Sequence, residues 1–181
     1  INNINALVKY PFPGTYLKRL VKRIIGIDPN EKDPWEKNQL VWNILELLPE
    51  LMKEEEAQVI RSWLKISDKE NAQINLNLWD LANNIAETFD DYILYRPEII
   101  KQWLSKKTKK KSREISVNKN ILWQEILFNL LYKKINKDPF CIQVEKAIKR
   151  LKKDDISKLD YPKNLYIYGL SSLAPLQIDL I

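Results

Sequence analysis

The 181-residue sequence contains no histidine, only three glycines and a single cysteine. Without histidine the chain cannot build a Ser-His-Asp or Cys-His nucleophile, an imidazole general base or any Cys/His zinc site. Three glycines are too few for a G-x-x-x-x-G-K-S/T loop or a G-x-G-x-x-G turn, and neither motif occurs. We therefore predict no catalytic residue, no metal site and no cofactor bound by the chain itself.

Two further catalytic patterns are missing or incomplete. Restriction-type nucleases commonly place an acidic residue two positions before a lysine, and no such pair occurs here. The string Gly169-Leu170-Ser171-Ser172-Leu173 resembles an esterase nucleophile elbow but lacks the second glycine and any histidine. Ser172 is more simply interpreted as the cap of a following helix, and Cys141 as a small buried hydrophobe.

The composition favours a mainly α fold. Runs of Leu, Ile, Lys, Asn and Glu with nine prolines suit helices joined by short corners. One cysteine and no leader pattern indicate a reducing cytoplasm, and no apolar run is long enough to cross a membrane. Because the chain starts at Ile1 and shows no stop signal, we expect a fragment of a longer polypeptide. The net charge of +6 suits a nucleic-acid partner and is equally what an AT-biased genome produces.

Hydrophobic periodicity predicts a series of helices and one strand. Residues Tyr10–Gly14 are predicted not to be helical. The predicted helices span Tyr16–Ile25, Pro34–Leu48, Glu50–Leu64, a long segment that follows a capping box at Ser67–Glu70 and reaches Arg96, Pro97–Leu104, Ile121–Ile135, and Asp138 to about Lys153. Residues 164–169 read as a buried strand whose partners lie outside the fragment, unless this end is disordered or paired with a neighbour.

Three charged segments allow a functional and a structural interpretation. The helix Tyr16–Ile25 carries Lys18, Arg19, Lys22 and Arg23 between apolar residues, which favours a solvated face over DNA contact. Glu87, Asp90 and Asp91 lie within about one helical turn, with no cation at their i+3 or i+4 positions except the possible reach of Arg96. The run Lys106–Arg113 is predicted to be a mobile loop that either touches phosphates or is merely solvated.

Four strings occur in one order along the chain: Leu40–Pro49 (LVWNILELLP), Phe89–Glu98 (FDDYILYRPE), Trp123-Gln124 and Leu165–Leu176 (LYIYGLSSLAPL). Their order and spacing resemble the N-terminal part of the RecC family, the gamma subunit of exodeoxyribonuclease V. The resemblance implies a helical bundle, a helicase 1B-like insertion, attached to a remnant of a RecA-like α/β domain without ATP motifs. Residues 1–30 would leave that domain, 31–160 form the helical domain, and 161–181 re-enter it with the strand.

The resemblance also implies a function. In this family the subunit is not an enzyme by itself but belongs to a RecBCD-type helicase/nuclease that acts in double-strand break repair and recombination. It bridges RecB-like and RecD-like motor subunits, which use ATP and Mg²⁺, and it guides the 3′ single strand through a channel and screens it for a regulatory sequence. The implied location is the bacterial cytoplasm, in association with the nucleoid.

The screening surface of the family, carried over position by position, comprises Phe12, Lys18, Glu87, Thr88, Asp90, Asp91 and Arg96. Carboxylates can accept hydrogen bonds from base amino groups, arginine can donate to a base or phosphate, and phenylalanine can stack on a base. The chain departs from the family pattern at Lys18, Glu87 and Thr88, where the family has an aromatic residue, aspartate and leucine. The alternative interpretation is a helical protein-interaction module that makes no contact with nucleic acid.

Overall fold

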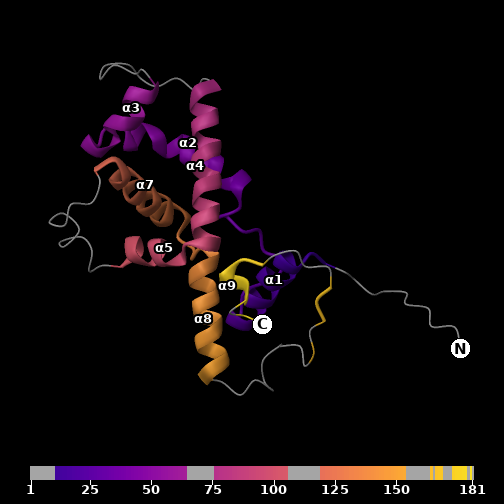
Figure 1. The fold of residues 1–181 in the computed structure, drawn as a ribbon. Coiled ribbons are helices and arrows are strands. Elements are labelled where there is room, and N and C mark those ends of the chain that lie inside the picture. The colour runs from indigo at the N-terminus through magenta and orange to yellow at the C-terminus, as the bar shows by residue number, and fades with distance from the viewer. Residues whose placement is uncertain are drawn as a thin grey trace, which may run out of the picture. The chain divides into compact units, whose positions relative to one another are not determined.

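The computed structural model describes residues 11–64, 76–105, 119–153, 164, 166–168, 173–178 and 180. The chain divides into two compact units, the first formed by Ile1–Glu31 and Gln143–Ile181 and the second by Lys32–Ile142. The described residues are mainly helical, which confirms the predicted fold class at that level (Figure 1). The division into residues 1–30, 31–160 and 161–181, and the helicase 1B and RecA-like assignments, stay predictions.

The first unit contains α1 (Pro13–Ile25), most of α8 (Phe140–Lys153) and the short α9 (Pro175–Ile178). The apolar stripe of α1 is buried: Leu17, Leu20, Val21 and Ile24. Gly26 ends α1 in the left-handed region at φ 81°, where glycine carries no Cβ penalty. The Arg150 side chain of α8 then donates a 2.9 Å hydrogen bond to the last-turn carbonyl of Ile24.

The prediction that Tyr10–Gly14 is not helical was wrong for its last two residues. Pro13 stands in the first turn of α1, where a helix needs no N–H donor, and its fixed φ suits the helical backbone. The helix therefore begins two residues before Thr15. Lys22 was assigned to the solvated face, but it is buried and donates a 2.6 Å hydrogen bond to the carbonyl of Glu31.

The second unit is built from α2 (Lys37–Leu51), the 3-10 turn η1 (Glu55–Ala57), α3 (Gln58–Leu64), α4 (Leu76–Tyr95), α5 (Pro97–Leu104) and α7 (Lys119–Ile135). Helix α2 packs against α4 and α7, and α5 packs against the same two helices. In Figure 1, α4 is the long helix of this unit. The predicted bounds of α5 are confirmed, and those of α7 and α8 are close to the ones observed.

The predictions around α2 need two corrections. The helix begins at Lys37 rather than Pro34, because the Asp33 carboxylate accepts the backbone N–H of Trp35 at 3.0 Å and holds a turn there. Pro49 lies inside α2 and does not break it. A proline inside a helix removes the hydrogen bond that its N–H would donate to the carbonyl four residues earlier, and α2 continues for only two residues beyond it, to Leu51. The predicted inward residues of this segment are all buried: Trp35, Leu40, Val41, Ile44, Leu45 and Leu48.

Residues Glu50–Leu64 were also predicted to form one helix. In the structure, Glu50 and Leu51 belong to α2, and η1 and α3 follow after a turn. The described residues of the predicted strand, Asn164 and Tyr166–Tyr168, form no strand. Tyr166 is 75% exposed and Tyr168 83%, so this segment is not the buried strand that we expected. A strand needs a neighbouring strand with which to form hydrogen bonds, and no strand occurs among the described residues. The capping box Ser67–Glu70, the run Lys106–Arg113 and Ser172 lie outside the described residues.

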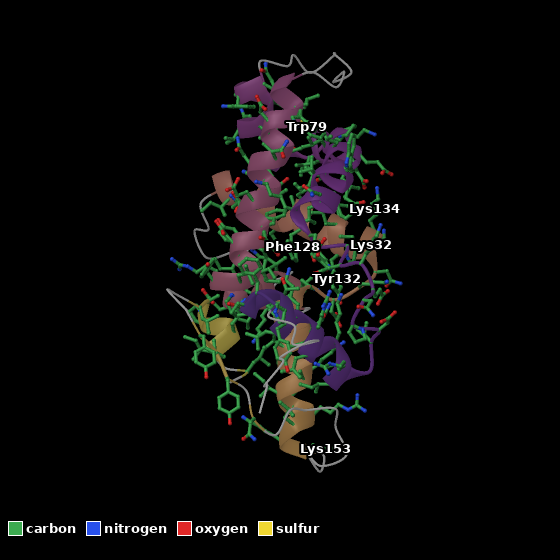
Figure 2. All side chains as sticks on the ribbon, turned by 90° about the vertical axis from the view of Figure 1, so that its right-hand side faces the viewer. Lys32, Trp79, Phe128, Tyr132, Lys134 and Lys153 are labelled. Carbon is green, nitrogen blue, oxygen red and sulfur yellow. The ribbon has the colours of Figure 1, made fainter. Side chains whose placement is uncertain are left out.

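Stacked and edge-to-face rings form the core of the second unit. Phe128 of α7, labelled in Figure 2, stacks on Trp35 with ring centroids 5.0 Å apart. It also lies edge-on to Phe89 of α4 at 5.3 Å and against Trp103 of α5 at 5.5 Å. The indole N–H of Trp35 donates to the carbonyl of Lys137 at 2.9 Å, which satisfies its polar edge. We call Trp35, Phe89, Trp103 and Phe128 the aromatic cluster. It joins α4, α5 and α7 with the turn before α2.

Replacing Phe128 with alanine tests the aromatic cluster. Phe128 is fully buried, so truncation leaves a cavity among Trp35, Phe89 and Trp103. We expect the free energy of unfolding to fall by about 3–5 kcal/mol. Ile121→Ala, on the same helix but 45% exposed, should change it by less than about 0.5 kcal/mol. Urea unfolding followed by tryptophan fluorescence measures both, and equal effects would contradict the assignment.

The Tyr132 hydroxyl provides a test at high pH. Burial raises the pKa of Tyr132 above 10.0, and its 2.8 Å hydrogen bond to Asp138 raises it further. The native chain therefore holds this proton more tightly than the unfolded chain. The protonated hydroxyl contributes fully to the stability of the native state below pH 10, and this contribution disappears as the pH rises through the native pKa. We expect the stability difference between the parent chain and Tyr132→Phe to shrink above pH 10. A difference that stays constant in urea unfolding across this range would be inconsistent with the raised pKa.

Candidate nucleic-acid interface

The second half of α4 presents the predicted acidic residues on the side away from the aromatic cluster. Phe89, Ile85 and Ile93 are buried on the inner side of the helix. At 3.6 residues per turn, this orientation turns Glu87 and Asp91 outward, and both are exposed. Asp90 and Thr88 flank them and are half-buried. The structure thus brings Glu87, Thr88, Asp90 and Asp91 together on about one turn.

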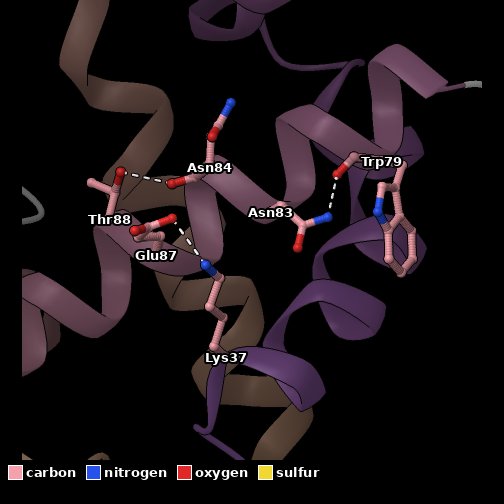
Figure 3. A network of polar contacts seen from close by, with 6 residues as sticks. All are labelled: Lys37, Trp79, Asn83, Asn84, Glu87 and Thr88. Carbon is pink, nitrogen blue, oxygen red and sulfur yellow. Dashed lines mark hydrogen bonds and ion pairs between the residues drawn. The ribbon is translucent and has the colours of Figure 1, made fainter.

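Polar contacts hold two of these side chains (Figure 3). Lys37 of α2 donates a 2.9 Å hydrogen bond to the carboxylate of Glu87, and both side chains stay largely exposed, at 44% and 64%. The Thr88 hydroxyl donates to the carbonyl of Asn84 at 2.8 Å, the usual back-bond of a helical threonine. Helical spacing in the sequence offered only Arg96 as a possible cation for this turn, whereas Lys37 comes from another helix, through the packing of α2 on α4.

Arg96 stands at the break between α4 and α5. Pro97 starts α5, and the backbone of Arg96 leaves the helical region with φ −133° and ψ 51°. Its N–H still donates to the carbonyl of Tyr92 at 3.0 Å. Arg96 is exposed and so is its neighbour Tyr95, at 54%. A guanidinium and an aromatic ring thus follow the acidic turn directly, on the same helix end.

Phe12 and Lys18, the other two predicted residues, belong to the first unit. Phe12 precedes Pro13, and its carbonyl accepts the first backbone hydrogen bond of α1, from Tyr16 at 2.9 Å. Phe12 is 84% exposed, so the face of its ring is accessible for stacking. Lys18 is half-buried on α1.

The first unit carries a second basic surface, which was not predicted from the sequence. Four cations follow one face of α8 at i, i+3, i+4 and i+7: Lys146, Lys149, Arg150 and Lys153, which we call the α8 basic stripe (Figure 2 labels Lys153). All are exposed, and the opposite face buries Val144 and Ala147. Lys149 pairs with Glu145 at 2.6 Å and Arg150 binds Ile24, so two of the four are held in place. The spacing of Lys and Arg after Val144 was the signal that could have revealed it.

Within the described ranges no group of His, Cys, Asp and Glu side chains is arranged to hold a metal ion. Among the same residues, no helix is both long and apolar enough to span a membrane. Cys141 is buried, in agreement with its interpretation as a small hydrophobe. The acidic turn of α4 is therefore a set of hydrogen-bond acceptors at the surface, next to the donor Arg96.

Comparison with known proteins identifies the family. The model of the family described as RecC, N-terminal domain, matches residues 1–181. This chain belongs to the RecC N-terminal domain family. The RecBCD enzyme subunit RecC of Haemophilus influenzae is 22% identical over 200 residues, a match that covers 98% of this chain and 17% of that protein. The subunit of the same name from Escherichia coli is 30% identical over 101 residues, which is 55% of this chain and 8% of the relative.

A mycobacterial relative agrees with these two. The RecBCD enzyme subunit RecC of Mycobacterium tuberculosis is 23% identical over 154 residues, covering 83% of this chain and 13% of its own length. The chain thus spans less than a fifth of the length of each of these RecC relatives. The resemblance drawn from the four sequence strings is confirmed at the level of the family.

The exposed ion pair in the acidic turn allows a stability test. Because Lys37 and Glu87 are both widely exposed, their attraction is screened by water and is worth at most about 1 kcal/mol. We expect Glu87→Gln to lower the free energy of unfolding by less than that amount, as measured by urea unfolding. A larger decrease would mean that Glu87 supports the fold beyond this ion pair, and that its effects on binding cannot be separated from folding.

Proposed function

We propose that this chain is a segment of the non-catalytic gamma subunit of a RecBCD-type helicase/nuclease, and that it helps to guide and screen the 3′ single strand. The observation that carries the proposal is the acidic turn of Glu87, Asp90 and Asp91 followed by Arg96, in a chain matched over its whole length by the RecC N-terminal domain. The relatives are named as subunits of the RecBCD enzyme, which supports the assignment to such a complex.

The chemistry of the α4 turn suits reading of a moving strand. Exposed carboxylates can accept hydrogen bonds from the exocyclic amino groups of cytosine and adenine. They also repel phosphates, so the backbone is not gripped tightly at the point where bases are read. Arg96 can donate to guanine or to a phosphate, and Tyr95 beside it offers a face for stacking.

The first unit supplies the opposite chemistry. The α8 basic stripe runs from Lys146 to Lys153, seven residue steps or roughly 10 Å at the rise of an α-helix. Such a row of cations suits the phosphate backbone, whose contacts position a strand without reading its sequence. Phe12 supports the same role, because an exposed ring accepts any base by stacking.

The proposed partners follow from the complex. RecB-like and RecD-like subunits would bind the gamma subunit and would use ATP and Mg²⁺, while this segment contributes only binding surfaces. A RecBCD-type complex acts on chromosomal DNA, so the proposed location is the bacterial cytoplasm at the nucleoid.

Substitutions in the α4 turn test the reading role. In the full-length subunit assembled with its partners, we expect Arg96→Ala and Asp91→Asn to alter sequence-dependent pausing. Arg96→Ala should also weaken binding of labelled single-stranded DNA in fluorescence anisotropy by about 5- to 100-fold, because it removes one charge-assisted hydrogen bond. Glu55→Gln, an exposed carboxylate of η1 in the same unit, is the matched control and should change neither readout. Unchanged binding and pausing in Arg96→Ala and Asp91→Asn would refute the assignment.

The α8 basic stripe predicts a salt effect. We expect Lys146→Gln with Lys153→Gln to weaken binding of all single strands alike and to reduce the slope of log K against log salt by about 0.7 for each phosphate that is no longer neutralised. Lys53→Gln, an exposed lysine in the second unit, is the control and should leave the slope unchanged. Binding that is insensitive to salt in the parent complex would favour the protein-interaction module instead.

A further inference from the structure

Two tryptophans meet on the outer surface of the second unit. Trp42 of α2 and Trp79 of α4 lie edge to face, with ring centroids 5.2 Å apart. Trp42 is 62% exposed and Trp79 36%, so their contact leaves most of one indole and part of the other in water. The aromatic cluster that forms the core of this unit includes neither ring.

The pair lies between two antiparallel helices. Lys37 contacts Glu87 and Trp42 contacts Trp79, so α2 and α4 run in opposite directions where they pack. Figure 3 shows Asn83 between Glu87 and Trp79 on α4, with its side-chain amide donating to the carbonyl of Trp79 at 2.9 Å. The rings are therefore carried on a helix pair that is already packed, which lowers the entropic cost when a ligand binds.

The carboxylates around the tryptophan pair favour a cationic ligand. Asp80 follows Trp79 and is exposed, as are Glu36, the N-cap residue of α2, and Glu46 and Glu50 on α2. Two cations of α2 and α7 are engaged, since Lys37 pairs with Glu87 and Lys134 with Glu46, and the exposed Lys53 follows the end of α2. Phosphates are disfavoured in such a field, whereas a guanidinium or ammonium group is attracted both by the carboxylates and by the indole faces.

We propose that the Trp42–Trp79 pair is a docking site for a basic segment of another protein subunit. An arginine or lysine of that segment lies against the exposed indole faces, and its charge meets Asp80. Tryptophans of this kind often dominate the affinity of protein interfaces, and an acidic rim speeds the encounter with a basic partner. This inference rests on the proposed function, because the partner is a motor subunit of the same complex.

The experiment uses the full-length gamma subunit and its purified RecB-like and RecD-like partners, titrated separately by biolayer interferometry. Trp42→Ala with Trp79→Ala should lower the affinity for one partner at least about ten-fold. Trp63→Ala removes a tryptophan that is 56% exposed on α3 and makes no ring contact with this pair, so it should bind as the parent does. Circular dichroism of each variant controls for folding.

Charge reversal distinguishes a protein segment from a nucleic acid. Asp80→Lys should weaken partner binding several-fold and reduce its dependence on salt, because an attraction becomes a repulsion. If the pair instead stacks on bases, Asp80→Lys should strengthen binding of single-stranded DNA, and the double tryptophan variant should abolish it. That result would overturn the inference.

The outcomes also separate the inference from the function on which it rests. Retention of the parent affinity for both partners by the double tryptophan variant overturns the inference alone. A parent subunit that binds neither partner overturns the proposed function, and the docking site with it. Weakened partner binding in the double variant with unchanged DNA pausing supports the docking site as distinct from the α4 turn.

Discussion

The packing of Phe128 against Trp35, Phe89 and Trp103 is the constraint from which the surface of the second unit follows. These rings come from four separate segments, and each can be buried only if its helix turns one defined side inward. For α4, burial of Phe89 requires that Glu87 and Asp91 face solvent. For α5, Pro97 starts the helix directly after the exposed Arg96, and burial of Trp103 fixes which side of α5 faces inward. The outward position of Glu87 and Asp91 is thus a consequence of the aromatic core, whereas the place of Arg96 follows from the start of α5 at Pro97.

The sign of the exposed charge differs between the acidic turn of α4 in the second unit and the α8 basic stripe in the first unit. This difference suits separate roles for the two surfaces. The carboxylates of the acidic turn of α4 and of α2 disfavour phosphates on the part of the second unit that they occupy. In the first unit the α8 basic stripe offers cations that suit a backbone. A subunit that lets a strand slide while sampling its bases needs both kinds of contact, since a purely basic surface holds phosphates too tightly.

Local patterns predicted most of the helices because each has an apolar stripe of helical period. The acidic turn of α4 was found for the same reason, since its residues are neighbours in sequence. Contacts between distant segments could not be read in this way. The pairing of Lys37 with Glu87, the hydrogen bond from Lys22 to Glu31 and the contact of Trp42 with Trp79 depend on how elements pack. Pro13 and Pro49 misled the prediction of helix bounds. A proline in the first turn removes no helical hydrogen bond, so α1 can begin at Pro13, and α2 continues for two residues past Pro49, which the sequence pattern does not show.

Contact between the 3′ strand and the end of α4 is the central proposal, and photochemical crosslinking tests it most directly. Single-stranded DNA carrying 5-iodouracil would be bound to the full-length complex, irradiated, and mapped by mass spectrometry of the crosslinked peptides. We predict crosslinks within residues 87–96, where the exposed Tyr95 offers a reactive ring beside Arg96. Crosslinks in this chain that map only to Trp42 and Trp79, or the absence of any from residues 87–96, would contradict the proposal.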